Sequence, residues 1–506
     1  MSIPAVWPIV APGFFPVHDD AQAARVQQMY VALRGGQFPV RWVPDLGYGY
    51  GYPIFNFYNP LPYYFGAGFM FIGFNVLTAT KLMYVFPVFL SGITMFIFSR
   101  LVLSNAASAL AGILYVYAPY HAVQIYVRGS VAEYWAYAIL PLVFYALWKR
   151  KIIIGSLSLA ALILSHNLTA FMSIPFVVLL FFISFRHCEE RSDAAISKSK
   201  TELPYSLLIF VVTIALGIGL SVFFWLPATI EIGKTQVSQM VFEKFDPPSK
   251  HVAYPLQLWS GVWGYGGSSP GIDDGLSFQV GKIHLIGSLT AFLIYLGYIL
   301  KKITNHSSLF SLSNLFNHFN HLIFFSIVGL VFSIFMLLPP SRPIWDAFPV
   351  LSYIQFPWRF LTFASLFSSL LTAWAIDAFA IRNSRPVIRY SLLTAYCLLL
   401  TAYSLPFFQP KFKFPITVDQ LISREKLIWD YSKISDEYLP KGFAPPVNAE
   451  VALRIDNQQN KLLVDELKAL TPVRQTANLI SLFSVLTFIT FIIVISIKKH
   501  GQNISG

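Results

Sequence analysis

Three ionisable residues stand side by side near the start of a very apolar chain: His18, Asp19 and Asp20, within "APGFFPVHDDAQAARVQQM". Adjacent carboxylates beside an imidazole can remove a proton from an attacking hydroxyl group or hold a divalent cation. The same stretch also fits the start of a helix, because Gln22 follows Asp19 by three positions, as in a capping box, and a Gly-Gly pair could end the helix. The two interpretations are compatible, since a helix N-terminus favours negative charge.

Further polar candidates lie in short motifs between apolar runs. They are Arg128 and Glu133 in "YHAVQIYVRGSVAE", His166 and Asn167 in "LSHNLTAF", and Arg359 in "QFPWRF". An arginine there can bind a lipid phosphate, although Arg128 could equally pair with Glu133. His166 could be a structural histidine, and Arg359 could anchor the chain at the membrane interface beside its neighbouring tryptophan. Ionisable groups at a membrane surface are costly unless paired or solvated, so all five are functional candidates.

The composition is that of a membrane protein. Of the 506 residues, 56% are hydrophobic, 17% are aromatic and 12% are charged. Uncharged runs of roughly 18 residues or more, the length of a membrane-spanning helix, occur for example at 82–99, 205–225 and 479–497. The net charge is +12, but the basic residues cluster beside apolar runs, which is typical of cytoplasmic flanks. We therefore expect an all-α polytopic membrane protein with no nucleic-acid partner.

The basic clusters predict the orientation, because cytoplasmic loops carry an excess of Lys and Arg. The clusters are Arg100, residues 149–151, the connector 186–204, residues 301–302, Arg382 with Arg385 and Arg389, and residues 498–499. Each successive pair encloses two apolar runs, so about 11 crossings fit, and every candidate residue falls on the outer side. The aromatic run at 61–75 is too short to cross and is expected to form an interfacial or re-entrant helix.

This topology divides the chain into four parts: a first external loop with interfacial helices (1–81), a multi-helix membrane domain (82–405), an external subdomain (406–478), and a final crossing with a cytoplasmic tail (479–506). The membrane domain includes an external loop, 226–282, and the cytoplasmic connector, 186–204. Charges of both signs alternate with apolar positions in the external subdomain, for which we expect a small α/β fold. The Gly-rich "YGGSSPGIDDG" matches no phosphate-binding pattern and predicts a turn or flap.

Several motifs resemble those of a known family. "GYGYPIFNFYNPLPYY", "VRGSVAEYWAYAILPL", "LSHNLTAF", "YGGSS", "QFPWRF" and "EYLP" are similar to motifs of the bacterial membrane proteins labelled 6-pyruvoyl-tetrahydropterin synthase-related, which resemble YfhO-like proteins. An acidic first external loop, a helix and a proline-led interfacial segment also resemble the GT-C superfamily of glycosyltransferases. The label refers to a soluble zinc enzyme whose histidine site has no counterpart here. The resemblance implies a further membrane helix before residue 1, so we expect that the chain as given starts late.

The resemblance implies an inverting glycosyltransferase of the bacterial inner (plasma) membrane, acting in cell-envelope glycan assembly with its active site facing outside. It would transfer a sugar from a polyprenyl-phosphate donor to a glycan, lipid or protein acceptor. Asp19 or Asp20 would be the general base, with a narrow preference for Asp19. The residues implied in binding the donor phosphate are Arg128, His166 and Arg359. Those implied in support are His18, Glu133 and Asn167.

Two alternatives belong to other classes of protein. A transporter or flippase of lipid-linked glycans would place ionisable residues near the bilayer midplane and broken helices at repeated positions, whereas this chain shows no internal repeat and almost no charge within its apolar runs. A catalytically silent scaffold of envelope assembly is the other. The spacing of Cys and His predicts no metal site, although the paired aspartates could hold a divalent cation such as Mg or Mn.

Overall fold

Helices make up the described fold. The computed structural model describes residues 2–193, 199–237, 240–241, 246–305, 321–378, 386–469 and 471–504. Within these ranges strand pairing is limited to isolated bridges, such as the one between Phe14 and Phe414. The prediction of an all-α polytopic membrane protein is confirmed.

Seven helices in this part of the chain are long and apolar enough to cross a membrane. They belong to α5 (Val76–Ser99), α8 (Val131–Trp148), α10 (Asn167–Asp193), α11 (Ser199–Glu231), α14 (Lys282–Asn305), α18 (Leu361–Ile376) and α24 (Pro472–Ile504). An eighth arises if α16 (His321–Leu337) and the segment Pro339–Ala347, bent by 82° from it, form one span. Shorter apolar helices are α6 (Asn105–Val116), α9 (Ile152–Ser165) and Leu393–Phe407, which continues α19 (Pro386–Ser404). The count of about 11 crossings stays a prediction.

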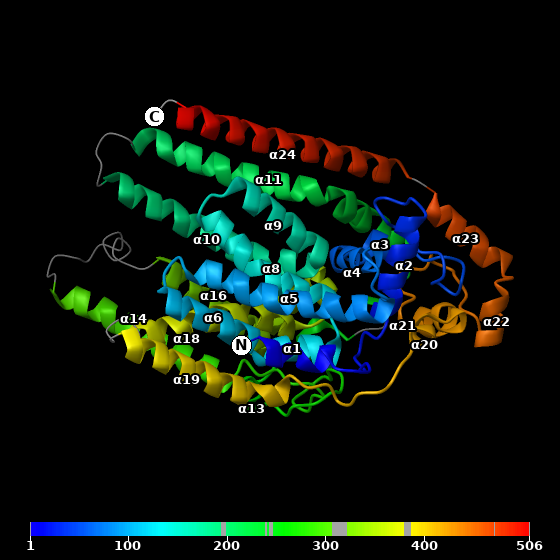
Figure 1. Cartoon of the computed structure of the whole chain (residues 1–506), viewed down its shortest axis with the longest axis horizontal. Helices are drawn as coiled ribbons and strands as arrows, with labels where there is room; N and C mark the ends of the chain where they lie inside the picture. Colours follow the sequence, from blue (N-terminus) through cyan, green and yellow to red (C-terminus); the bar gives the residue numbers. More distant parts are fainter. Residues whose placement is uncertain are drawn as a thin grey trace.

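The long helices lie side by side along the longest axis of the molecule, and short elements gather at one end of the bundle (Figure 1). Those from the N-terminal part are α2 (Gln22–Arg34), α3 (Ile54–Phe57) and α4 (Leu61–Phe71); α1 (Ile3–Val10) packs against α5. Those from the C-terminal part are α20 (Val418–Ile422), α21 (Ser432–Ile434), α22 (Ala449–Arg454) and α23 (Gln458–Lys468). Segments about 400 residues apart therefore share one end of the bundle.

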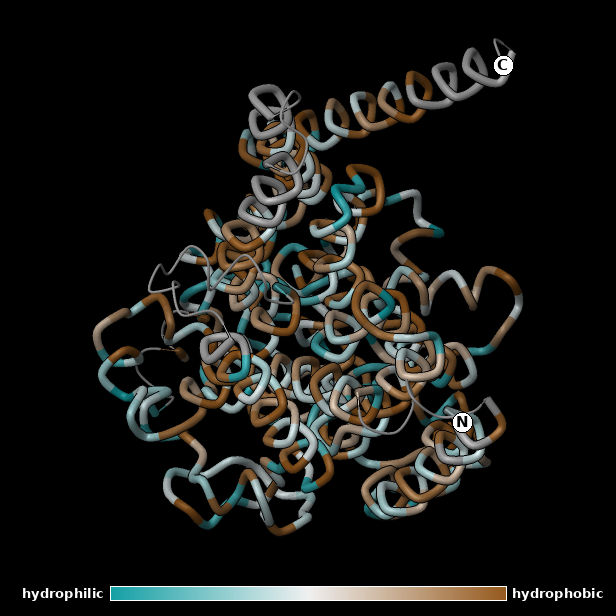
Figure 2. Tube along the Cα trace, turned by 90° about the vertical axis from the view of Figure 1, so that its left-hand side faces the viewer, coloured by the Kyte–Doolittle hydropathy of each residue, from teal (hydrophilic) through white to brown (hydrophobic). Residues whose placement is uncertain are grey.

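The helices differ sharply in burial. In the apolar windows of α8 and α18, 83% of the residues are buried inside the protein, against 17% for α24. Figure 2 shows the bundle from one end, with the apolar helix that leads to the C-terminus standing away from the remainder. The outer helices thus offer their apolar side chains to lipid, whereas α8 and α18 form the centre.

A buried ion pair fastens α24 to α11. The guanidinium of Arg474 donates to both oxygens of Glu231, at 2.7–3.0 Å, and both side chains are 2% exposed. Asn56 of α3 and Thr471 donate to the same carboxylate. All these groups are mutually satisfied, which is the condition under which a buried ion pair persists.

Three expectations need correction or comment. The helix α2 begins after Ala21, whose side chain cannot cap it, so Asp19 is not an N-cap residue. The external subdomain is helical and has no α/β sheet within its described residues, because apolar residues such as Leu427, Ile428 and Tyr431 follow a helical spacing and Asn and Thr side chains cap its short helices. The basic residues Arg382 and Arg385 lie outside the described ranges.

Candidate active site

The N-terminal loop is held against the segment that carries Arg128. The backbone N–H groups of His18 and Asp19 donate to the carbonyl oxygens of Val127 and Arg128, each at 3.0 Å. That segment is a π-helix, η1 (Val123–Arg128), and it ends at Gly129 with a φ of +61°. A Cβ atom on Gly129 would overlap Val17, so a glycine is needed for this close approach.

The carboxylate of Asp19 is engaged within the protein. Its Oδ2 accepts hydrogen bonds from Gln22 Nε2 at 2.8 Å, Arg25 Nη1 at 2.8 Å and the Tyr58 hydroxyl at 3.2 Å. The Arg25 guanidinium also lies over the Tyr58 ring, 4.5 Å from its centroid. Three donors on one oxygen stabilise the ionised carboxylate, so Asp19 is suited to hold the loop and Arg25 in place.

Asp20 has a different environment from its neighbour. It is half-buried, and no hydrogen bond to its carboxylate is formed by any residue that the structure describes. Burial raises the pKa of Asp20 to about 6, the Lys426 ammonium partly offsets this rise, and the Asp19 carboxylate adds to it. A carboxylate with this pKa is a useful proton acceptor near neutral pH. His18 is exposed, with its Nε2 3.1 Å from the carbonyl oxygen of Tyr265.

A second cluster surrounds Glu133 in the first turn of α8. Its Oε2 lies 2.7 Å from Arg128 Nη1 and 3.7 Å from Arg359 Nε, and its side chain is 2% exposed. The Tyr120 hydroxyl donates to Oε1 at 2.5 Å. One carboxylate therefore faces two guanidinium groups, which leaves the cluster with one net positive charge.

Arg359 is incompletely satisfied in this cluster. Its Nε and Nη1 atoms are buried and have no hydrogen-bond partner in the described part of the protein, and only Nη2 reaches Gln355 Oε1, at 3.4 Å. Arg128 lies over the ring of Trp358, 4.6 Å from the centroid. Unpaired buried donors on a cation are costly, and an anionic ligand would satisfy them. Both arginines are 11% exposed, so Arg359 is not a surface anchor.

His166 ends α9 beside the same cluster. His166 Nδ1 lies 2.7 Å from Thr169 Oγ1 and accepts the backbone N–H of Thr169 at 3.3 Å, and on these contacts we assign the ring proton to Nε2. Burial lowers the pKa of His166 to about 3; the Glu133 carboxylate opposes this shift, and the Arg359 and Arg128 guanidinium groups add to it. His166 is thus a neutral hydrogen-bond donor close to these three charges. Asn167 begins α10 and is half-buried, and the described residues form no hydrogen bond with its side chain.

Tyr58 connects the two clusters. Its hydroxyl donates to Asp19 and acts electrostatically on both Arg128 and Arg359. The structure therefore brings six of the sequence-predicted residues into one region. They are Asp19, Asp20, Arg128, Glu133, His166 and Arg359.

Several neighbours of the site escaped prediction. Arg25 reaches Asp19 from the first turn of α2, and no helical spacing relates the two residues, because Asp19 lies before the helix begins. Tyr58 and Tyr63 belong to a run of aromatic residues in which no single tyrosine stands out. Lys426 and Tyr438 come from the external subdomain and reach the site only through tertiary packing.

The surroundings of Asp19 and Asp20 are poorly suited to the divalent cation that the sequence allows. Any cation between the two aspartates would share Asp19 Oδ2 with the Arg25 guanidinium, 2.8 Å away. Within the ranges that the structure describes, no group of three or more His, Cys, Asp or Glu side chains is arranged to hold a metal ion. Like charge at Arg25 opposes a cation at this oxygen.

Taken together, these features describe a polytopic α-helical membrane protein in which a cluster of ionised side chains links the N-terminal loop to α8 and to the segment before α18. The chain belongs to the family described as 6-pyruvoyl-tetrahydropterin synthase related domain, a family of membrane proteins, whose model matches residues 55–410.

Comparisons with individual proteins give more distant similarities. An uncharacterized protein of Lactococcus lactis subsp. cremoris (strain MG1363) is 27% identical over 241 residues, which cover 45% of this chain and 38% of that protein. The arabinofuranosyltransferase AftD from Mycobacteria aligns with a TM-score of 0.48 and 11% identity, over 82% of this chain and 27% of AftD. A mutant of AftD aligns with a TM-score of 0.46, also at 11% identity, over 82% of this chain and 28% of the mutant. The chain spans well under half the length of each of these proteins.

Removing the shared carboxylate should destabilise the protein. In Glu133→Gln, two buried guanidinium groups lose their counter-ion, so we expect the free energy of unfolding to fall by about 3–5 kcal/mol. Chemical denaturation of the purified protein in detergent measures this change. The matched control is Glu450→Gln, which breaks the exposed pair with Arg454 and should cost less than about 1 kcal/mol. Equal losses in the two variants would contradict the role of Glu133.

Proposed function

We propose that this protein is an inverting, GT-C type membrane glycosyltransferase that transfers a sugar from a polyprenyl-phosphate donor to an acceptor outside the cytoplasm. The observation that carries the proposal is that Asp20, whose carboxylate receives no hydrogen bond from the described residues, lies in the loop whose backbone is bonded to Arg128. Arg128 and Arg359 share the Glu133 carboxylate and form a cluster of net positive charge. A base and an anion-binding group at one site are what glycosyl transfer from a phosphate requires. The motifs that resemble the GT-C superfamily support the same class.

In the proposed reaction, the acceptor hydroxyl attacks the anomeric carbon of the donor sugar. The bond between that carbon and the phosphate oxygen breaks, and its electron pair leaves with the polyprenyl phosphate. The proton of the attacking hydroxyl passes to Asp20. We assign the base to Asp20 and a positioning role to Asp19, because Asp19 Oδ2 already accepts three hydrogen bonds.

The leaving phosphate is assigned to the second cluster. Arg359 offers the buried Nε and Nη1 donors that lack partners within the described protein, and the neutral His166 offers Nε2–H. Arg128 adds positive charge while remaining paired with Glu133. Because these groups are in place before the reaction, they stabilise the developing phosphate charge without reorganisation.

The proposal places this site at the outer face of the plasma membrane. The basic clusters that flank the apolar runs predict this side, and the donor lipid would enter from the bilayer beside the helix bundle. Of the three predicted classes of acceptor, we favour a glycan. The donor sugar is to be identified by testing a panel of polyprenyl-phosphate sugars.

Asp20→Asn should abolish most of the transfer. We expect the rate to fall by about 10²- to 10⁴-fold, the usual contribution of a general base. The assay follows transfer from a panel of undecaprenyl-phosphate sugars to glycan acceptors in proteoliposomes, with Asp465→Asn on the exposed face of α23 as the control. Unchanged transfer in Asp20→Asn would refute the assignment, and lipid flipping without any transfer would favour the transporter.

The pH dependence of the rate tests the same assignment. Only the ionised Asp20 accepts a proton, so the rate should rise with pH and level off above its pKa of about 6. The Lys426 ammonium lowers the pKa of Asp20, so Lys426→Met should move the midpoint of this profile to higher pH. A midpoint that stays in place would show that another group controls the rate.

Arg359→Met should separate anion binding from folding. This change removes the Arg359 guanidinium and its 3.7 Å ion pair with Glu133 but leaves Glu133 paired with Arg128 at 2.7 Å, so stability should be maintained while transfer falls about 10²- to 10³-fold. Transfer and the unfolding midpoint are measured on the same preparation. A loss of stability that matches the loss of transfer would assign Arg359 a structural role only.

A further inference from the structure

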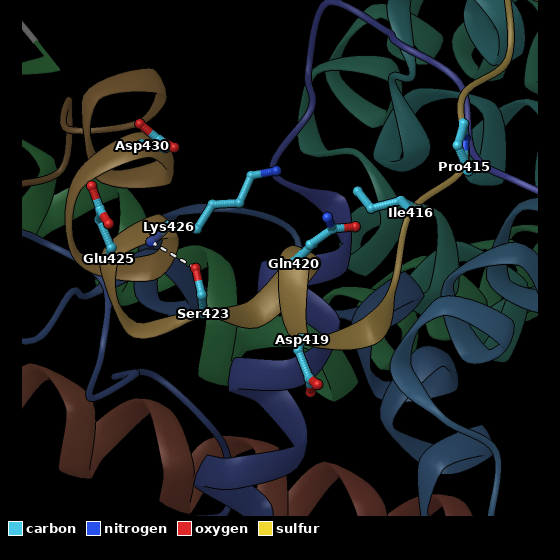
Figure 3. A pocket seen from close by; sticks show the side chains of 8 residues that line it. All are labelled: Pro415, Ile416, Asp419, Gln420, Ser423, Glu425, Lys426 and Asp430. Carbon is cyan, nitrogen blue, oxygen red and sulfur yellow. Dashed lines mark hydrogen bonds between the residues drawn. The ribbon is translucent and has the colours of Figure 1, made fainter.

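The external subdomain contains an open cavity of about 660 Å³ that the site described above does not use. Its volume lies within the range of small-molecule sites. The lining residues are Pro415, Ile416, Asp419, Gln420, Ser423, Glu425, Lys426 and Asp430. Figure 3 shows Lys426 extending across the opening, with Glu425 and Asp430 on one side and Ile416 and Pro415 on the other.

This cavity is next to Asp20. The helix α20, which supplies Asp419 and Gln420, packs against α2, whose N-terminal end follows Asp20 directly. The Lys426 ammonium acts electrostatically on Asp20. The backbones of Phe14 and Phe414 form two hydrogen bonds with each other, at 2.9 and 3.0 Å. Phe414 directly precedes Pro415 at the edge of the cavity, and Phe14 lies in the loop that leads to Asp20, so these bonds hold the two segments together.

The polar groups of the lining are available to a ligand. In the part of the chain that the structure describes, the carboxylates of Asp419 and Glu425 form no hydrogen bond or ion pair, and Asp430 is 3.6 Å from the exposed Lys433. Carboxylates accept hydrogen bonds from neighbouring hydroxyl groups, and Gln420 adds an amide. The apolar edge formed by Pro415 and Ile416 can cover the C–H face of a sugar ring.

The charge of the lining selects among saccharides. The lining carries three carboxylates and the Lys426 ammonium, and Asp430 also pairs with Lys433 at 3.6 Å, so one negative charge remains in excess. An acidic glycan would meet like charges, whereas a neutral glycan would not, and an amino sugar would gain attraction.

We infer that the cavity between α20 and Asp430 is the acceptor subsite, and that it binds a neutral or amino-bearing saccharide and disfavours an acidic one. This inference rests on the proposed function, in which the bound saccharide is the acceptor and presents a hydroxyl group to Asp20. Binding of the saccharide needs neither the donor lipid nor catalysis, so the acceptor subsite and the proposed enzymatic function can be rejected separately.

The test is direct binding of three sugar tetramers to the full chain in detergent, without donor lipid. The probes are tetramers of N-acetylglucosamine (neutral), glucosamine (cationic) and galacturonic acid (anionic), and binding is followed by calorimetry. We expect the neutral and cationic tetramers to bind at least tenfold more tightly than the anionic one. Equal binding of all three, or binding of none, would overturn the inference.

A pair of double variants locates the binding. Glu425→Gln with Asp430→Asn should weaken binding of the cationic tetramer about tenfold and reduce discrimination against the anionic one, with an unchanged unfolding midpoint because both side chains are exposed. The matched control is Asp465→Asn with Glu466→Gln, which removes two exposed carboxylates from α23 of the same subdomain. Equal affinities in the two double variants would place the sugar elsewhere. Binding that follows this pattern in a protein without transfer activity would keep the subsite and reject only the enzyme.

Discussion

The site depends on one buried carboxylate shared by two buried arginines. Glu133 lies in the first turn of α8, Arg128 ends the π-helix before it, and Arg359 lies just before α18. This ion cluster therefore ties together the two helices that are most deeply buried. Ionised groups in such surroundings are tolerated only when each is paired and hydrogen-bonded. Glu133 meets this condition, with Tyr120 and Gln124 donating to it as well. Arg359 does not meet it within the described part of the protein, and its buried Nε and Nη1 donors are the reason for which we propose an anionic ligand.

The rest of the site is built on this centre. The backbone of the N-terminal loop is hydrogen-bonded to the segment of Arg128, which places Asp19 and Asp20 beside the positive cluster. Aromatic packing then joins this loop to the external subdomain, since Tyr48 stacks on Phe443 and Phe57 stacks on Tyr438. The adjacent aspartates thereby acquire different environments: Asp19 accepts three hydrogen bonds, whereas Asp20 accepts none from the described residues and is influenced by Lys426. Such a division of roles between neighbouring carboxylates follows from surroundings and not from residue type.

Much of the architecture could be predicted from the sequence, because a membrane imposes strong constraints. Runs of apolar residues locate helices, and the polar motifs located Asp19, Asp20, Arg128, Glu133, His166 and Arg359, which lie in one region of the structure. The outer orientation that the basic clusters indicate stays a prediction. The pairing of Arg128 with Glu133 was also open to prediction, as one of two alternatives, from their separation of five residues.

Other features could not be predicted, for physical reasons. The capping-box spacing of Asp19 and Gln22 was misleading, because Gln22 bonds to the side chain of Asp19 and not to its backbone. The helical subdomain was taken for α/β, since short apolar and charged stretches carry little information on periodicity. The preference for Asp19 over Asp20 rested on sequence alone, whereas their difference arises from Arg25, Tyr58 and Lys426, which tertiary packing supplies.

The most direct measurement is a structure of the full chain with undecaprenyl phosphate, the common part of the proposed donors. The account predicts phosphate density within hydrogen-bonding distance of Arg359 Nη1 or Nε, with Arg128 still paired to Glu133 and Asp20 facing the phosphate across the site. A phosphate bound elsewhere, or an Arg359 that turns away from it, would contradict the account.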